Sequence, residues 1–203
     1  MRRRIRWVAW AVFGMMWGPG LVPAAFPHEE GHTAETFAAY HSSRAELPVA
    51  FEYPAAWQVE ESSGTHEAYA QVQVYGPASL EPRLRTYLVV RCVPPKAEGG
   101  RYANLDEMVE SYRATLQAGL RVDEERKVQV LSQPATQLDV SGIFQLPLDA
   151  PGERSVPVKS QRIFFEQEGR LYELAWMGTP EVAEQVAAAF AHLLQALRVI
   201  PHS

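Results

Sequence analysis

The stretch Tyr87-Leu-Val-Val-Arg-Cys-Val93 decides the fold, because its apolar residues do not keep to one side of a strand. Successive side chains of a strand point to opposite faces. Apolar side chains fall on both faces here: Tyr87, Val89 and Val93 on one, and Leu88, Val90 and Cys92 on the other. A strand with no polar face lies inside a sheet that is covered on both sides.

A second stretch, Leu171-Tyr-Glu-Leu-Ala-Trp-Met177, has the same property and follows the turn Glu168-Gly169-Arg170. The segment Ala68–Tyr75 differs, because Ala70, Val72 and Val74 alternate with tyrosines and glutamines. This alternation predicts a strand with one apolar face. We therefore expect two central strands and at least one strand with a polar face, whose tyrosines, Tyr69 and Tyr75, pack beneath a helix or, as the alternative, contact a partner.

Two segments carry helix signals. Asn104-Leu-Asp-Glu107 is a capping box, and apolar residues then recur at helical spacing as far as Leu116. The second segment begins with Thr179 as N-cap and Pro180 at the first helical position, and extends to about Arg198. These two amphipathic helices are available to cover the two faces of the sheet.

The order of the elements predicts the fold class. Strands are expected at 48–53, 58–60, 68–75, 84–93, 127–132, 135–144, 158–167 and 171–177, with a break at Gln133-Pro134. A proline-rich connection, Leu146–Pro157, joins two of them. Adjacent hairpins indicate an α+β protein: an αβα sandwich with a mainly antiparallel sheet of about six to eight strands and helices on both faces.

The first 24 residues predict an export signal. Four arginines lie between residues 2 and 6, an apolar run of eleven residues follows at Trp7–Trp17, and Val22-Pro23-Ala24 supplies small residues for cleavage next to Ala24 and Ala25. That run is shorter than the roughly 20 residues that span a membrane. A Sec-type signal is expected, with a twin-arginine signal and a retained tether as alternatives. No cysteine follows the apolar run, so lipoprotein modification at that site is excluded.

The rest of the chain is expected to form a flexible arm, 25–46, with a turn of helix at Ala34–Tyr40, and one domain, 47–200. The whole chain has 19 basic and 24 acidic side chains; without the four signal arginines, 15 basic ones remain and the formal charge is −9. This charge argues against nucleic acid and against an anionic lipid surface. Cys92 is the sole cysteine, so an intrachain disulfide is excluded, and a buried thiol is expected.

Catalytic motifs are weak. His28-Glu29-Glu30-Gly31-His32 has the spacing of zinc metalloproteases, but it lies in the arm, where Pro27 and Gly31 disfavour the required helix. A solvated segment is expected there, with weak metal binding as the alternative. The chain has no Gly-x-Ser-x-Gly motif, and His192 and His202 lie near its end. The sequence therefore predicts no enzyme activity and no cofactor.

Two motifs resemble the PsbP-like domain family, which includes bacterial PsbP-related and DcrB-like proteins. Glu52-Tyr-Pro-Ala-Ala-Trp57 is similar to the turn near the start of these domains, and Gly169-Arg-Leu-Tyr-Glu-Leu-Ala-Trp-Met-Gly-Thr-Pro180 is similar to a later strand. The motif that closes the family's last helix is only approximate here, after Phe190. The resemblance implies an exported αβα sandwich that acts as an accessory, assembly or binding protein without enzymatic activity.

The expected function is thus that of a periplasmic or secreted accessory protein, which assembles or stabilises a membrane or redox complex by binding a protein partner at or near a membrane. Its contact surface is predicted to include the Leu146–Pro157 loop, with Arg154. The alternative is a carrier of a small apolar ligand in a pocket between sheet and helix, near Trp57, Tyr112 and Trp176. After cleavage no membrane-spanning segment is expected. No motif in the sequence specifies the partner or the oligomeric state.

Overall fold

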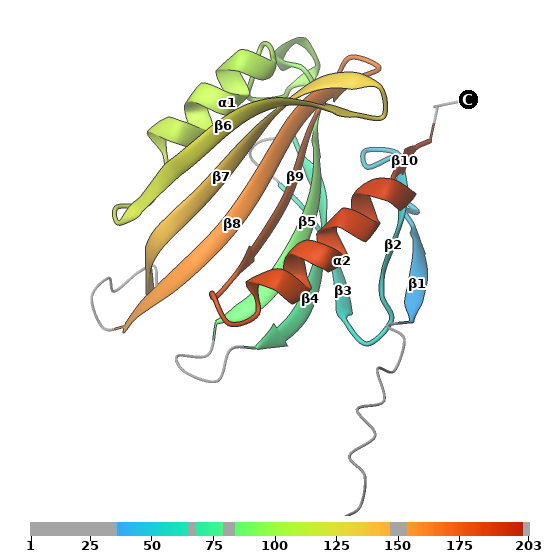
Figure 1. Cartoon of the computed structure of the whole chain (residues 1–203). Helices are drawn as coiled ribbons and strands as arrows, with labels where there is room; N and C mark the ends of the chain where they lie inside the picture. The colour runs from blue at the N-terminus through green and yellow to red at the C-terminus, as the bar shows by residue number, and fades with distance from the viewer. Residues whose placement is uncertain (1–35, 65–67, 79–83, 147–153, 201–203) are drawn as a thin grey trace, which may run out of the picture. The chain divides into compact units, whose positions relative to one another are not determined.

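The computed structural model describes residues 36–64, 68–78, 84–146 and 154–200 (Figure 1). The chain divides between residues 34 and 35, and everything described belongs to the second part. The predicted signal, its cleavage positions Ala24 and Ala25, and the His28–His32 motif lie outside the described residues. None of the helices in the described ranges is long and apolar enough to cross a membrane.

The described part of the main sheet has seven antiparallel strands in the order β3-β4-β5-β9-β8-β7-β6. The strands are β3 (Gln58–Ser63), β4 (Ala70–Ala78), β5 (Arg85–Val93), β6 (Leu120–Val130), β7 (Gln133–Leu146), β8 (Arg154–Gln167) and β9 (Arg170–Gly178). Two helices, α1 (Leu105–Ala114) and α2 (Ala183–Ala196), and a short 3-10 helix, η1 (Lys96–Glu98), accompany them. The predicted α+β sandwich with a mainly antiparallel sheet is confirmed.

The two strands that lack a polar face pair with each other in the middle of this sheet. β5 and β9 are antiparallel neighbours, from Tyr87 opposite Met177 to Val93 opposite Leu171. Both faces of the pair are largely buried, since Val89 and Val90 are 4% and 1% exposed and every residue from Leu171 to Met177 is buried. The sequence pattern therefore identified the centre of the sheet.

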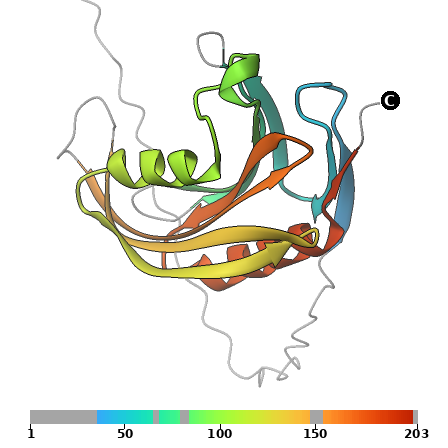
Figure 2. The same ribbon diagram turned by 90° about the horizontal axis from the view of Figure 1, so that it is seen from above.

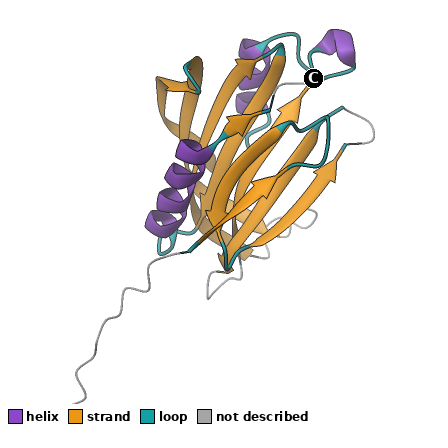
Figure 3. Cartoon of the chain, turned by 90° about the vertical axis from the view of Figure 1, so that its right-hand side faces the viewer, coloured by secondary structure: helices purple, strands orange, loops and turns teal. Residues whose placement is uncertain are grey.

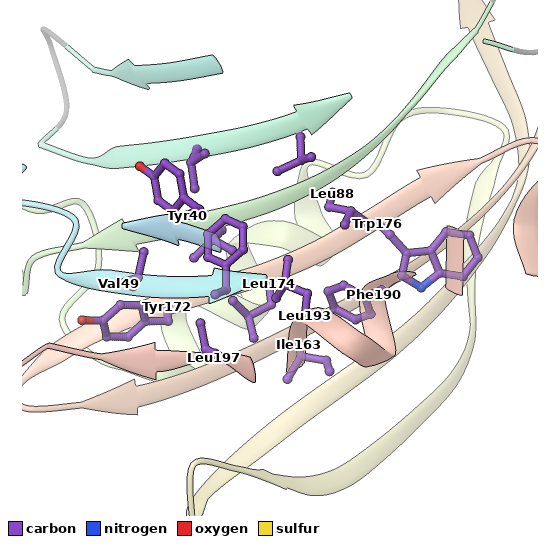
Figure 4. Packing of buried hydrophobic residues seen from close by; sticks show 14 of the residues in the cluster. Tyr40, Val49, Leu88, Ile163, Tyr172, Leu174, Trp176, Phe190, Leu193 and Leu197 are labelled. Atoms are coloured by element: carbon purple, nitrogen blue, oxygen red, sulfur yellow. The ribbon is translucent and has the colours of Figure 1, made fainter. Parts of the chain in front are cut away.

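The helices lie on opposite faces of the sheet, as Figure 2 shows. α2 packs on β9 and β5, and α1 packs on β8. The α2 side holds the larger core cluster, in which Leu88, Ile163, Leu174, Phe190 and Leu193 meet (Figure 4). The α1 side holds a smaller cluster of buried residues: Val93, Met108, Val109, Leu138, Val140, Phe164 and Leu171.

A second, three-stranded sheet has the order β1 (Phe37–His41), β2 (Val49–Pro54), β10 (Arg198–Val199), and α2 packs against its strand β2 (Figure 3). The turn of helix predicted at Ala34–Tyr40 is therefore wrong, and the predicted strand 48–53 does not belong to the main sheet. The reason is tertiary: β1 gains its hydrogen bonds from β2, and Tyr40 stacks on Phe51 at 4.7 Å. Local composition does not report such pairing.

The helix ends agree with the sequence signals in one case and differ in the other. At α1 the Asn104 side chain accepts a hydrogen bond from the Glu107 amide at 2.9 Å, which confirms the cap. α2 begins three residues later than predicted at Pro180, because the Val182 amide donates to the Thr179 carbonyl at 3.1 Å and closes a turn first. The Thr179 hydroxyl does not cap the helix and is buried.

The strands β6, β7 and β8 are each at least four residues longer than predicted. β6 and β7 form one long hairpin whose turn is Leu131-Ser132, with φ of 52° and 64°, and the predicted break at Gln133-Pro134 is wrong by two residues. Pro134 lies inside β7, opposite Gln129. β7 continues to Leu146 and β8 begins at Arg154, so the predicted loop Leu146–Pro157 narrows to 147–153, which lie outside the described residues.

Candidate functional site

Three charged side chains from the central strands meet on the α1 face of the sheet. Glu173 of β9 is 3% exposed and accepts hydrogen bonds from Arg91 of β5, at 3.0 Å, and from Arg162 of β8. The strand register produces this meeting, because Arg91 lies opposite Glu173 and Arg162 lies opposite Ala175, two residues along. We call Arg91, Arg162 and Glu173 the charged cluster.

The charged cluster has a surplus of one positive charge, since two guanidinium groups share one carboxylate. The Arg162 side chain is 15% exposed and that of Arg91 is 36% exposed. A buried charge of either sign is costly unless partners surround it. The surplus charge is therefore accessible chiefly at Arg91.

Tyrosine rings accompany both guanidinium groups. The Arg162 guanidinium lies 4.6 Å from the ring centre of Tyr112, which comes from α1, and that of Arg91 lies 5.2 Å from the ring centre of Tyr69. These distances are within the range of cation–π attraction. Burial raises the pKa of Tyr112, against an opposing effect of Arg162, so the phenol keeps its proton.

Arg91 is fixed in position by groups on two neighbouring strands. Its Nε donates to the side-chain oxygen of Gln71 at 2.9 Å, while its Nη1 donates to Glu173. The Gln71 amide in turn donates to the Ser62 hydroxyl at 3.0 Å, which sets the orientation of the amide. Arg91 is thus preorganised before any ligand arrives.

Arg91 also forms part of the wall of a surface pocket of about 120 Å³, which we call the arginine–tyrosine pocket. The residues lining it are Ala68, Tyr69, Arg91, Val93, Arg101 and Tyr102. None of them is acidic, and the Arg101 guanidinium lies 5.6 Å from the ring centre of Tyr102. An adjoining pocket of about 260 Å³ shares Ala68 and Tyr69 with it and adds Arg44, Glu46 and Arg170 to its lining.

The structure does not bring together the three aromatic residues of the predicted apolar pocket. Trp57 and Trp176 are 8% and 7% exposed and belong to the core on the α2 side (Figure 4 shows Trp176), whereas Tyr112 packs on Phe164 on the α1 side. The sheet separates them. Trp57 packs so closely on Gly76 that a β-carbon there would lie 2.8 Å from the indole ring.

The remaining predicted positions have simpler environments. Arg154 is the first residue of β8, opposite Leu146, and its side chain lies outside what the structure describes. Cys92 is buried, as predicted, and burial raises the pKa of its thiol. Within the described ranges, no three His, Cys, Asp or Glu side chains are grouped so that they could hold a metal ion.

One contact that the sequence did not indicate joins α2 to the small sheet. The His192 Nε2 atom lies 2.7 Å from a carboxylate oxygen of Glu52, and its ring stacks on Phe37 at 3.6 Å. The side chains of His192 and Glu52 are 33% and 49% exposed. This contact is structural, because it ties the helix to β1 and β2.

Sequence reasoning also missed the charged cluster, although a signal for it was present. Arg91 and Glu173 each interrupt an otherwise apolar segment of a strand, whereas Arg162 follows the polar run Lys159-Ser160-Gln161. A single charge in a buried strand requires a partner. The two charges on the strands expected at the centre of the sheet could therefore have been assigned to each other from the sequence, whereas Arg162 carries no such signal.

The comparisons with known proteins concern the fold. No family model matches the chain, and no curated protein sequence matches it either. Among solved structures, the chain is similar to a cyanobacterial PsbP from Synechocystis, with 12% sequence identity over 83% of this chain and 95% of that one and a TM-score of 0.49.

Two other solved structures are similar to the same extent. A protein of unknown function from Pseudomonas aeruginosa, described as a putative regulator, is 16% identical over 82% of this chain and 98% of its own, with a TM-score of 0.47. LpqN of Mycobacterium tuberculosis is described as involved in cell envelope biogenesis. It is 10% identical over 82% of this chain and 91% of its own, also with a TM-score of 0.47. Likenesses at this level carry no argument about function, and the PsbP-like resemblance rests on the sequence motifs.

Proposed function

We propose that this protein is an exported, non-catalytic binding protein that attaches to a protein partner at or near a membrane and helps to assemble or stabilise a membrane or redox complex. The observation that carries this proposal is the preorganised Arg91. A recognition group that is already fixed loses little conformational entropy when a ligand binds. Gln71 and Glu173 supply that fixation, and the arginine–tyrosine pocket gives a partner access to the guanidinium.

The protonation chemistry of the cluster supports binding more than catalysis. A general acid or base works best when its pKa lies near the operating pH. Both carboxylate oxygens of Glu173 accept hydrogen bonds from guanidinium groups, and burial raises the pKa of Tyr112. The Glu173 carboxylate is thus held by its two arginines, and the Tyr112 phenol keeps its proton near neutral pH.

Export is a separate part of the proposal and rests on the first 24 residues. Expression of the chain from Met1 in a bacterium, followed by N-terminal sequencing of the protein in the periplasm or medium, tests it. We expect a new terminus next to Ala24 or Ala25. A chain that stays in the cytoplasm and begins at residue 1 contradicts export but leaves the binding proposal intact.

Crosslinking in intact cells of the source organism tests the binding. The wild type should crosslink to one dominant membrane-associated protein, and Arg91→Gln should reduce the yield several-fold without a change in melting temperature. Arg154→Ala tests the surface predicted from the sequence in the same way. Arg121→Gln is the matched control, because the Arg121 side chain is 76% exposed and its Nε donates to Asp123, two residues away. The absence of a dominant crosslink in the wild type contradicts the proposed function.

A further inference from the structure

We infer that the protein binds an alkylammonium group, from a lysine side chain or a free amine, in a pocket next to the N-terminus of α1. The pocket has a volume of about 420 Å³, and the residues lining it are Leu105, Gln133, Pro134, Glu166, Gln167 and Glu168. We call it the glutamate pocket. The inference goes beyond the proposed function and does not depend on it.

The glutamate pocket forms where a helix and two strands end together. Leu105 is the first residue of α1, residues 133 and 134 are the first of β7, and residues 166 and 167 are the last of β8. Glu168 follows in the turn to β9, with φ of 52°. The structure describes all six residues together with their neighbours in the chain.

The two carboxylates of the pocket are available to a cation. Glu166 and Glu168 are exposed, and neither carboxylate forms a hydrogen bond or an ion pair with another residue in the described ranges. None of the lining residues is basic. Arg170, which follows the turn, lines a different pocket, and Lys127 donates to Thr136. The pocket therefore holds two uncompensated negative charges.

The N-terminus of α1 does not cancel these charges. A helix N-terminus carries a partial positive charge, which repels a cation unless it is compensated. Here the Asn104 side chain accepts from the Glu107 amide, the Glu107 carboxylate accepts from the Ala103 amide at 2.7 Å, and Asp106 adds a second carboxylate in the first turn. The helix end next to the pocket is thus capped by groups of its own.

The other lining residues select an ammonium group on an apolar stem. An ammonium group has three hydrogen-bond donors and no acceptor. Besides the carboxylates, the wall contains Gln167, whose Oε1 atom is buried and accepts no hydrogen bond from a described residue. A buried acceptor without a donor is destabilising, and a donor from a ligand removes that cost. Leu105 and Pro134 provide apolar surface for methylene groups, as alkyl stems prefer.

The geometry disfavours two other kinds of cation. Within the described ranges, no three His, Cys, Asp or Glu side chains are grouped so that they could hold a metal ion. Quaternary ammonium groups are recognised by aromatic rings, and the lining contains none. Pockets of about 300–1,000 Å³ hold complete small ligands, so 420 Å³ accommodates an alkylammonium group with its stem.

Titration of the purified chain with n-butylamine, followed by amide NMR, tests the inference. At about 50 mM salt the shift changes should be saturable and centred on Leu105, Gln133 and 166–168, and binding should weaken severalfold at about 300 mM salt because the charges are exposed. Tetramethylammonium should not bind. Absence of saturable butylamine binding, or shift changes centred elsewhere, overturns the inference.

Variants locate the contact. Glu166→Gln and Glu168→Gln should keep the melting temperature, because both positions are exposed and unpaired among the described residues, and each should weaken butylamine binding by about fivefold or more. Glu181→Gln is the matched control: it removes the same charge at an exposed position before α2 and should bind like the wild type. Equal weakening in all three variants would reflect net charge alone and overturns the site.

The length of the stem and the source of the amine are tested with further probes. From ethylamine to butylamine, affinity should rise by about twofold or more per methylene group, since each is buried against Leu105 and Pro134. Affinity that does not change with stem length, or Mn²⁺ that displaces butylamine at equal concentration, overturns the alkylammonium assignment. A capped lysine that binds more tightly than 1,5-diaminopentane supports a peptide as the source, and the reverse order supports a free amine.

Discussion

The two faces of the main sheet differ in what they bury. On the α2 side, large apolar side chains such as Phe165, Tyr172, Leu174 and Phe190 fill the space between sheet and helix. On the α1 side a shorter helix covers a smaller apolar cluster, and next to it the sheet buries the carboxylate of Glu173 between two arginines.

The difference separates stability from the recognition that we propose. Burial of apolar area stabilises a fold by about 25 cal/mol per Å², so the α2 side supplies most of the stability. In a buried ion pair the electrostatic attraction roughly offsets the free-energy cost of removing the two charges from water. The charged cluster therefore adds little net stability. What it does provide is a fixed guanidinium at the wall of a pocket.

The largest expected effect is on the α2 side. Phe190→Ala should lower the free energy of unfolding by about 3–5 kcal/mol, because it removes a side chain that is 1% exposed and leaves a cavity in the larger core cluster. Urea denaturation measures this. Ile200→Ala, at a position 40% exposed, is the control and should cost below about 1 kcal/mol. Equal effects would show that the core lies elsewhere.

The second effect is on the α1 side. Glu173→Gln should lower the free energy of unfolding by about 3 kcal/mol, because it leaves Arg162 buried without its counter-charge. Glu125→Gln, which removes a partner of Arg113 whose side chain is 40% exposed, should cost below about 1 kcal/mol. A Glu173→Gln protein as stable as the wild type would mean that the cluster is hydrated in solution.

A third effect concerns the long β6–β7 hairpin, which stands at one end of the strand order of the main sheet. Ser132 has φ of 64°, a conformation that costs an ordinary residue about 1 kcal/mol and glycine little. Ser132→Gly should therefore raise the free energy of unfolding by up to about 1 kcal/mol. Ser155→Gly, in strand β8, is the control and should be destabilising. A loss of stability at both positions would contradict the turn geometry.

The smallest effect links the small sheet to β3 and depends on pH. The Tyr40 hydroxyl donates to Glu61 at 2.6 Å and, together with Arg44, lowers the pKa of that carboxyl against the effect of burial. A carboxyl whose pKa is lower in the folded state stabilises the fold above its unfolded pKa, near 4.3, and loses this contribution as the pH falls. Tyr40→Phe should cost about 1 kcal/mol at about pH 7 and less at about pH 3. A cost that grows on acidification contradicts this sign.

The centre of the fold was predictable because burial leaves a simple pattern. Tyr87–Val93 and Leu171–Met177 are apolar on both faces, and only a covered, central position accommodates such strands. The Asn104–Glu107 cap was equally local, since its hydrogen bonds form within one turn.

The periphery was less predictable because its contacts are between distant residues. β1 gains its strand hydrogen bonds from β2. β10 also pairs with β2, although Arg198 and its partner Ala50 lie near opposite ends of the domain's sequence. The turn at Leu131-Ser132 lacks the asparagine and glycine that usually mark such a hairpin, so the sequence pattern places the break at Gln133-Pro134 instead. The charged cluster was missed because each of its residues was interpreted within its own strand.

The most direct test replaces the whole charged cluster by apolar residues. In the variant Arg91→Leu, Arg162→Met and Glu173→Leu, the free energy of unfolding should lie within about 1 kcal/mol of the wild type, since no charge is left unpaired, while the crosslink to the membrane-associated partner is lost. A triple variant as unstable as Glu173→Gln would contradict the division between a stabilising face and a recognising face.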